Sequence, residues 1–213
     1  MTVLVSWLRE MRISFARDAL WGAPGAAYSV GQSGGTIPMH DKSYLRTLID
    51  FNAWANEEMY QKVSELPPEE VKKERPTPLV SIFVSMHHLL NVDRIWMGHM
   101  QGKGHDYQTL RDVEIEELDE LWAARREMDK ALGEYVDSLS AEELEEVIDY
   151  ELIGGKTGTM SRTMCITHLA IHGAYHRGWI SDMFGQAGAP QPIIDIPVYE
   201  RALREGGLPP MPV

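Results

Sequence analysis

The sequence predicts an all-α protein that is built as a four-helix bundle. Four long stretches place apolar residues at the three- and four-residue spacing of a helix that buries one face. Prolines, glycines and short polar segments separate these stretches. The chain has 213 residues and is 44% hydrophobic, which is enough apolar material for one bundle domain with short additions.

The two ends of the chain differ in composition from the middle. Residues 1–20 have a short amphipathic pattern, and residues 21–38 are rich in glycine, alanine, serine and proline, which is typical of a linker. We therefore expect residues 1–38 to be a flexible N-terminal extension, with a partner-binding helix as the alternative. The bundle is expected over residues 39–187, and residues 188–213 are expected to form a Pro-rich C-terminal tail.

The first two predicted helices cover residues 40–66 and 79–101. Asp41 is suited to cap the first helix, and Pro67 with the proline after it ends that helix. The second helix is apolar on nearly every side over its first half, so we expect it to be central in the bundle. Gly102 follows its last turn.

The third predicted helix covers residues 115–139, and its acidic first turn suits the positive end of the helix dipole. Ser140 begins a capping signature for a short helical turn. Residues 147–159 change character and predict a small β-hairpin across the glycine turn GGKTG. The hairpin therefore lies in the third connection of the bundle.

The fourth predicted helix covers residues 161–186, with Ser161 as its N-cap and Gly185 and Gly188 at its end. Prolines prevent long helices in the tail, where residues 199–204 are predicted to form a short one.

The fourth helix carries the most informative side chains. His168, His172 and His176 are spaced four residues apart, so they share one face of the helix. The rest of that stripe is apolar and faces the core, where an imidazole is costly unless it is paired. His172 and His176 are therefore candidate ligands of one metal ion. The alternative is that the histidines pack as ordinary core residues without a metal.

A third ligand is expected from the second helix, which offers His87 and His88. The two side chains point about 100° apart, so one ion would rarely use both. Periodicity does not choose between them. One histidine from this helix with two from the fourth would leave an open position on the ion, as catalytic zinc sites do.

Other polar residues have weaker claims on this site. Cys165 lies about 10 Å along the helix axis from His172 and is expected to be a small buried hydrophobe. Asp93 and Asp182 are candidates to orient a ligand, although an ion pair with an arginine of the bundle is the simpler role for Asp93. His99, with His40 and His105, is expected to face solvent.

Charge and composition limit the possible functions. The net charge of −12 argues against a protein whose main task is to bind nucleic acid. The single cysteine and the lack of a long apolar run or a secretory signal favour a cytoplasmic protein that does not enter the membrane.

Three segments in order resemble the DinB-like (YfiT-like) family of bacterial DNA-damage-inducible proteins. FNAWANEEM in the first helix is similar to the family's YN-x-WAN, HHLLNVDRIW in the second to NHLLxADRxW, and HGAYHRGWI in the fourth to NHxxHHRGQ. The resemblance covers roughly residues 40–187. It implies an up-down-down-up bundle, a divalent metal ion, zinc or nickel, and frequent homodimers.

The resemblance also implies the ligand set His88, His172 and His176, because His87 falls where the family often has asparagine. Some relatives are thiol-dependent transferases or isomerases, so a low-molecular-weight thiol is an expected substrate or cofactor. The chain departs from the family at Tyr175 and Trp179, where the family often has histidine and glutamine, and this leaves the substrate open.

Two functions follow from these expectations. The first is a metal-dependent thiol S-transferase or hydrolase that acts on a small thiol or electrophile. The alternative is a non-catalytic, metal-stabilised helical bundle that acts through protein association.

Overall fold

The structure of the protein is a computed structural model that describes residues 41–109 and 111–206. The predicted N-terminal extension, residues 1–38, lies outside the described residues, as do His40 and the last seven residues of the predicted tail. No helix in the described part of the chain is long and apolar enough to cross a membrane.

Seven helices and two strands make up the described part of the chain. They are α1 (Lys42–Ser64), α2 (Pro68–Lys72), α3 (Ile82–Met100), α4 (Leu118–Ser138), α5 (Ala141–Glu145), β1 (Val147–Glu151), β2 (Thr157–Ser161), α6 (Arg162–Gln186) and α7 (Ile196–Glu205).

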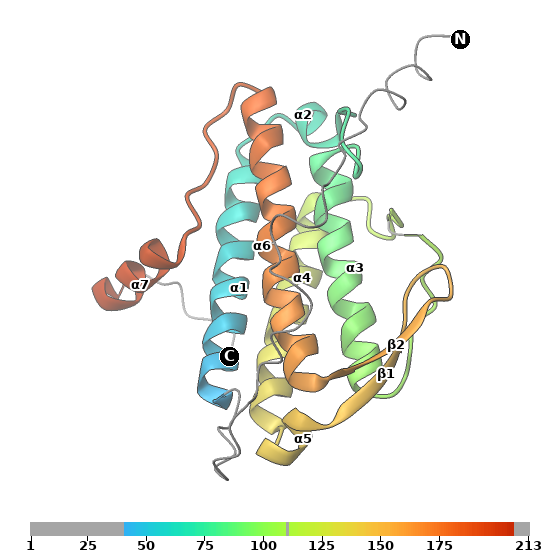
Figure 1. Ribbon diagram of the computed structural model, residues 1–213. Coiled ribbons are helices and arrows are strands. Elements are labelled where there is room, and N and C mark those ends of the chain that lie inside the picture. Colours follow the sequence, from blue (N-terminus) through green and yellow to red (C-terminus); the bar gives the residue numbers. More distant parts are fainter. Residues whose placement is uncertain (1–40, 110, 207–213) are drawn as a thin grey trace, which may run out of the picture. The chain divides into compact units, whose positions relative to one another are not determined.

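The four long helices α1, α3, α4 and α6 form the predicted bundle. α1 and α6 run in one direction along it, and α3 and α4 run in the other (Figure 1). α1 packs against α4 and α6, and α3 packs against the same two helices. The all-α bundle with a hairpin in its third connection is therefore confirmed.

Asp41 and Ser161 cap α1 and α6 as predicted, each accepting a hydrogen bond from a backbone N–H in the first turn of its helix. Ser81 caps α3 in the same way, a cap that was not predicted because the helix was expected to begin at residue 79. Ser140 and Glu143 form a reciprocal capping box on α5. These bonds satisfy donors that the first helical turn leaves without partners.

Some boundaries differ from the prediction. α3 begins at Ile82 rather than at residue 79, because the backbone turns at Val80 with φ of 54°. α4 begins at Leu118, three residues later than predicted. α2 was not predicted, although Pro68 suits a first helical turn.

α7 is longer than the helix predicted over residues 199–204. α7 begins at Ile196, because Pro197 lies in its first turn, where proline is tolerated. Tyr199 of α7 packs against α1, with ring centroids 5.6 Å from Phe51 and 5.3 Å from Trp54.

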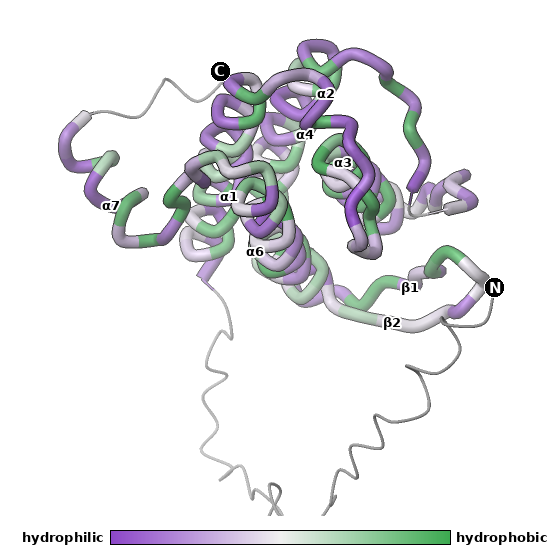
Figure 2. Tube along the Cα trace, turned by 90° about the horizontal axis from the view of Figure 1, so that it is seen from above, coloured by the Kyte–Doolittle hydropathy of each residue, from purple (hydrophilic) through white to green (hydrophobic). Residues whose placement is uncertain are grey.

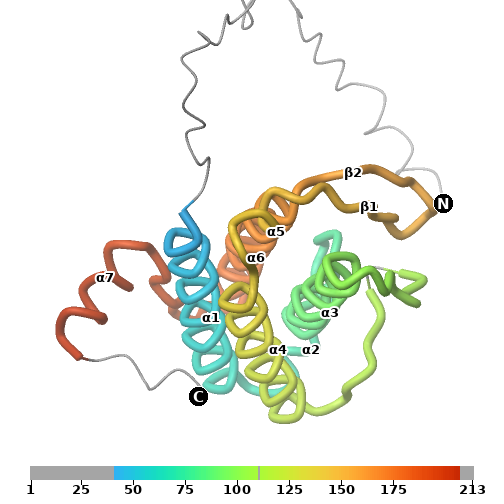
Figure 3. Tube along the Cα trace, turned by 90° about the horizontal axis from the view of Figure 1, so that it is seen from below, coloured from blue at the N-terminus to red at the C-terminus, as the bar shows by residue number. Residues whose placement is uncertain are grey.

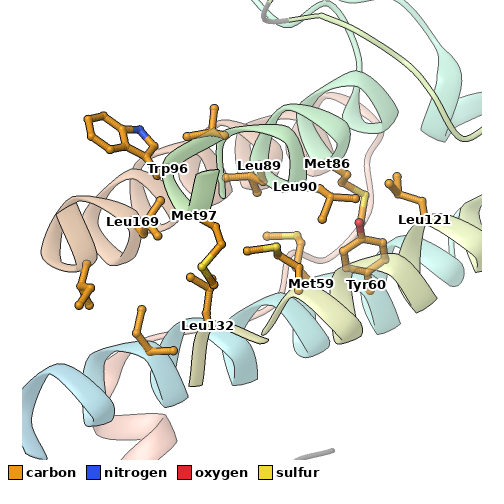
Figure 4. Packing of buried hydrophobic residues seen from close by; sticks show 14 of the residues in the cluster. Met59, Tyr60, Met86, Leu89, Leu90, Trp96, Met97, Leu121, Leu132 and Leu169 are labelled. Carbon is orange, nitrogen blue, oxygen red and sulfur yellow. The ribbon is translucent and has the colours of Figure 1, made fainter. Parts of the chain in front are cut away.

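The hydrophobic core lies between the four long helices. Methionines and leucines from α1, α3 and α4 converge there, among them Met59, Met86, Met97 and Leu132 (Figure 4). Leu132 is fully buried. The long flexible side chains of methionine fill the irregular space between helices that cross at an angle.

The hairpin and α7 lie on different sides of the bundle. Figures 2 and 3, which look along it from opposite ends, place α7 beside α1 and the hairpin beyond α3 and α6. β1 and β2 pair antiparallel, with Tyr150 opposite Gly158. The turn between them uses Gly154 and Gly155 at φ of 98° and 81°, a region that favours glycine.

Leu132→Ala is expected to lower the free energy of unfolding by about 2–5 kcal/mol, because it leaves a cavity in the core. Leu203→Ala is the control, since Leu203 is 44% exposed and a surface truncation usually changes stability by about 0.5 kcal/mol or less. Urea unfolding of both variants checks the prediction, and equal losses would contradict the placement of the core.

Candidate metal centre

The structure brings together one histidine of α3 and two of α6. Nε2 of His88 lies 3.2 Å from Nε2 of His172 and 3.3 Å from Nε2 of His176. The three nitrogens all lie within 4.8 Å of one another. His88 and His176 are buried and His172 is partly exposed, so the cluster is reached by solvent on the side of His172.

The spacing of these nitrogens suits a single divalent ion. Zn–N bonds of about 2.0–2.1 Å at tetrahedral angles separate two nitrogen ligands by about 3.3 Å. This is close to the separation of His88 from each of its two neighbours. Without an ion, the same contacts are N–H···N hydrogen bonds in which one nitrogen of each pair donates.

The cluster favours neutral imidazoles, which are the form that binds metal. Burial, followed by the charge of the neighbouring His176 and His88, lowers the pKa of His172 to about 3. Burial and then the charge of His88 lower the pKa of His176 to about 4. Nδ1 of both α6 histidines is buried without a hydrogen-bond partner, so among the described residues no side chain bonds the ring nitrogen that points away from the cluster.

The structure shows which of the two histidines of α3 lies in the cluster, a choice that periodicity could not make. His88 faces α6, whereas Nδ1 of His87 lies 3.0 Å from the carbonyl oxygen of Phe83 on its own helix. The His87 ring also packs against the Phe83 ring at a centroid distance of 4.6 Å. His87 is therefore a packing residue.

Two other histidines lie near the cluster without joining it. His168 packs against His172 with ring centroids 5.4 Å apart and against Trp96 at 4.9 Å. His99 was predicted to face solvent, and that prediction is wrong because only 6% of it is exposed. The rings of Trp96 and Tyr150 lie beside it, so the hairpin covers this turn of α3.

A cavity of about 750 Å³ opens beside the three histidines. Side chains of α3, α6 and the hairpin line it, together with Pro78 and Leu79 from the turn before α3 and Arg111 from the connection between α3 and α4. The turn contains Val80 at φ of 54°, a conformation that costs a β-branched residue about 1–3 kcal/mol. The strained turn thus supplies part of the cavity wall.

A buried polar network connects all four long helices. One of its residues directly follows a histidine of the cluster in the sequence of α6. The network consists of six buried side chains: Asn52, Asn56, Asp93, Arg125, Asp129 and Arg177. Arg177 follows the candidate ligand His176 and donates from Nη1 to Oδ1 of Asn52 at 2.7 Å and of Asn56 at 2.8 Å. The histidine pair of α6 is thereby tied to α1.

Arg125 is the centre of the other half of this network. Its Nη1 lies 2.8 Å from a carboxylate oxygen of Asp93, and its Nη2 lies 2.9 Å from one of Asp129. These are ion pairs by distance, but their angles are not those of hydrogen bonds. Asn56 donates to Asp129 at 3.0 Å, which joins the two halves.

Burial governs the ionisation of this network. Burial raises the pKa of Asp93 to about 6, against the opposing charge of Arg125. Burial also lowers the pKa of Arg177 to about 10, so this arginine remains protonated at neutral pH. The formal positive charges of the two arginines equal the formal negative charges of the two aspartates. Buried charges are tolerated when they are paired in this way.

The other residues that the sequence analysis considered for the metal site do not contact the three imidazoles. Asp93 forms the ion pair that was its simpler predicted role. Asp182 is exposed and accepts a hydrogen bond from Gln186 at 2.7 Å. Cys165 is fully buried, and burial raises the pKa of its thiol to about 11, so it is no nucleophile at neutral pH.

Apart from the ion pair expected for Asp93, sequence reasoning missed this network. Arg125 falls on the apolar stripe of its helix, at the spacing of Leu121 and Leu132. A charged residue on such a stripe indicates a buried partner of opposite charge. That signal was present in the sequence.

Comparison with known proteins identifies relatives of the chain. The DinB family model matches residues 39–207. Protein DinB of Bacillus subtilis (strain 168) is 28% identical over 169 residues, which cover 71% of this chain and 91% of that protein. The crystal structure of a DinB-like protein from Bacillus cereus ATCC 10987 aligns with a TM-score of 0.50 at 17% identity, covering 66% of this chain and 90% of that one.

Arg125→Met is expected to lower the free energy of unfolding by about 3–5 kcal/mol, because it leaves two buried carboxylates without their cation. Arg126→Met is the matched control. Its side chain is 46% exposed and pairs with Glu57, and a surface ion pair contributes about 0–1 kcal/mol. Thermal or urea unfolding compares the two, and adding Asp93→Asn to Arg125→Met should recover part of the loss.

The metal-free protein is expected to lose stability as the pH falls from about 6.5 to about 4. The folded-state pKa values of His172 and His176 are about 3 and about 4, below the ~6.5 of an unfolded chain. The unfolded state therefore binds more protons in this window, so stability rises with pH.

Unfolding in urea with a chelator at several pH values measures this dependence. The double variant His172→Gln, His176→Gln should show a shallower slope than the wild type. Asp93 titrates in both proteins, so its opposite contribution cancels in the comparison. Equal slopes would mean that the two imidazoles are not held neutral by the fold.

Proposed function

The chain belongs to the DinB family, and we propose that it is a divalent-metal-binding member in which His88, His172 and His176 hold the ion. The observation that carries this proposal is the convergence of the three Nε2 atoms at the wall of a cavity. We propose further that the site is catalytic, as in a metal-dependent thiol S-transferase or a hydrolase.

The ligand set and its surroundings favour a catalytic ion over a purely structural one. Structural zinc sites are usually closed by four protein ligands, whereas catalytic sites keep a position open. Here three histidines converge, and no Cys, Asp or Glu of the described residues joins their group. The adjoining cavity gives a small molecule access to the open side.

A divalent ion held at this site would lower the pKa of a water or thiol and so supply a nucleophile near neutral pH. The chain's own residues prepare the site for it. Burial keeps His172 and His176 neutral, and the network around Arg125 and Arg177 fixes the helices that carry the ligands. Apolar side chains form most of the cavity wall beside these groups.

Zinc or nickel is proposed on the resemblance to the family, because imidazole ligands by themselves suit zinc, nickel, copper and iron alike. We also propose a low-molecular-weight thiol as cofactor or substrate, with an electrophile as the second substrate. This part of the proposal is supported only by the resemblance to the family. A cytoplasmic homodimer that binds neither nucleic acid nor membrane remains a prediction from the sequence.

A structural role for the ion is the second proposal, and one observation favours it. The three histidines join α3 to α6 across the bundle, so an ion between them would also hold these helices together. The protein would then act through association with a partner.

Protein purified without a histidine tag is expected to bind about one equivalent of zinc or nickel per chain. His88→Ala, His172→Ala and His176→Ala should each lose this metal while remaining helical, because two imidazoles hold an ion much less tightly than three. His87→Ala and His168→Ala are the matched controls and should retain it. Mass spectrometry of metal content, with circular dichroism, tests this, and unchanged metal in any of the first three variants would refute the ligand set.

Chelation followed by thermal unfolding separates the two roles of the ion. A large fall in melting temperature, with no turnover of thiol or ester substrates by the intact protein, would favour the structural role. A small fall would favour an exchangeable catalytic ion.

A further inference from the structure

We propose that the cavity beside the three histidines binds a small molecule with a ring-sized apolar body and an anionic group, which Arg111 receives. This inference rests on the proposed function, because it describes the substrate class of the same site. It is carried by the chemistry of the cavity wall, by the position of Arg111 and by the size of the space.

Among the described residues, the cavity wall contains no acidic side chain. Its lining has four histidines and Arg111, and every other lining residue is apolar or aromatic. The chain as a whole has 32 acidic residues and a net charge of −12. A cavity without a carboxylate in such a protein is suited to an anionic ligand, and a divalent ion on three neutral histidines would add further positive charge.

Two tryptophans give the cavity its apolar character. Trp96 of α3 packs against His168 at 4.9 Å, and Trp179 of α6 packs against His176 at the same centroid distance. Ile153 and Met160 of the hairpin add aliphatic surface. Indole faces of this kind bind flat apolar rings, because such pairs gain both buried area and favourable ring geometry.

The hairpin holds this wall in place through a close contact between its strands. Tyr150 lines the cavity and packs against Trp96 at 5.1 Å. It lies over Gly158, where an added Cβ would meet the Tyr150 hydroxyl at 2.5 Å. Glycine at this position therefore lets the tyrosine ring approach the facing strand closely.

Arg111 is the charged side chain that remains available to a ligand. It is exposed, lines the cavity, and has no carboxylate of the described residues within ion-pair distance. Arg94 is a useful contrast, since it pairs with Glu114 at 3.1 Å. An unpaired guanidinium at the edge of an apolar cavity is a receptor for a carboxylate or a phosphate.

The cavity is large enough for such a molecule. Its volume of about 750 Å³ lies within the range of about 300–1,000 Å³ that is usual for small-molecule sites. The expected ligand therefore has one group that reaches the histidine cluster, a ring between the tryptophans, and an acidic group at Arg111.

The test uses zinc-loaded full-length protein and the probe 4-(mercaptomethyl)benzoate, with calorimetry as the measurement. Its neutral analogue 4-(mercaptomethyl)benzamide should bind about tenfold more weakly, because it lacks the charge-assisted bond to arginine. 3-Mercaptopropionate, which lacks the ring, should also bind more weakly. Arg111→Gln should reduce the preference for the acid over the amide to about twofold or less, whereas Arg94→Gln should keep it.

Metal content measured on the same samples distinguishes the possible failures. Arg111→Gln should retain its zinc, since Arg111 is not a proposed ligand. Equal binding of acid and amide by zinc-loaded wild type, or an unchanged preference in Arg111→Gln, would overturn the inference while leaving the metal site intact.

If the wild type binds no metal, the proposed function fails and the cavity is tested by itself. 4-Methylbenzoate and 4-methylbenzamide lack the thiol, and ligand-observed NMR compares them on chelator-treated protein. A preference for the acid that depends on Arg111 would support the cavity's specificity, and no preference would refute it.

Discussion

Two buried arginines determine how the helices of this bundle meet. Arg125 of α4 joins Asp93 of α3, and Arg177 of α6 joins Asn52 and Asn56 of α1. Burying such charges is costly, and the cost is offset only when each guanidinium finds its partners at fixed positions. Apolar side chains tolerate sliding of one helix past another, whereas these contacts permit one register. We therefore infer that the network restricts the register of the helices.

The candidate metal centre depends on that register. His176 directly precedes Arg177, and His88 lies five residues before Asp93 on α3. A shift of α3 by one turn would move its histidine about 5.4 Å along the axis and separate it from the two on α6. Close approach of α1 to α6 adds to this constraint, because a Cβ at Gly173 would meet Oδ1 of Asn52 at 2.4 Å. The three imidazoles are thus brought together before any ligand binds.

Much of this arrangement follows from the sequence. Apolar spacing predicts the four long helices, and capping residues such as Ser161 predict where they begin. The i, i+4 pair His172 and His176 predicts half of the site. Spacing did not choose between His87 and His88, because α3 is buried on nearly every side and both are 3% exposed or less. The sequence of a helix without a polar face does not indicate which side faces a given neighbour. Only the resemblance to the family or the structure could therefore identify His88 as the residue in the cluster.

Other features depend on contacts between segments that are distant in the sequence. His99 is buried because Tyr150 of the hairpin lies beside it, and no local pattern indicates that contact. The cavity and its unpaired Arg111 likewise arise only when α3, α6, the hairpin and a connecting segment meet. In contrast, α2 and the full length of α7 were within reach of sequence reasoning, since Pro68 and Pro197 lie in first turns, where proline is tolerated.

Anomalous diffraction from crystals of the zinc-loaded protein tests the central claim most directly. The account predicts one strong peak at about 2.0–2.1 Å from Nε2 of His88, His172 and His176, with its open side toward the cavity. A zinc peak bound by carboxylates elsewhere, or no peak at the three histidines in protein that has been exposed to excess zinc, would contradict it.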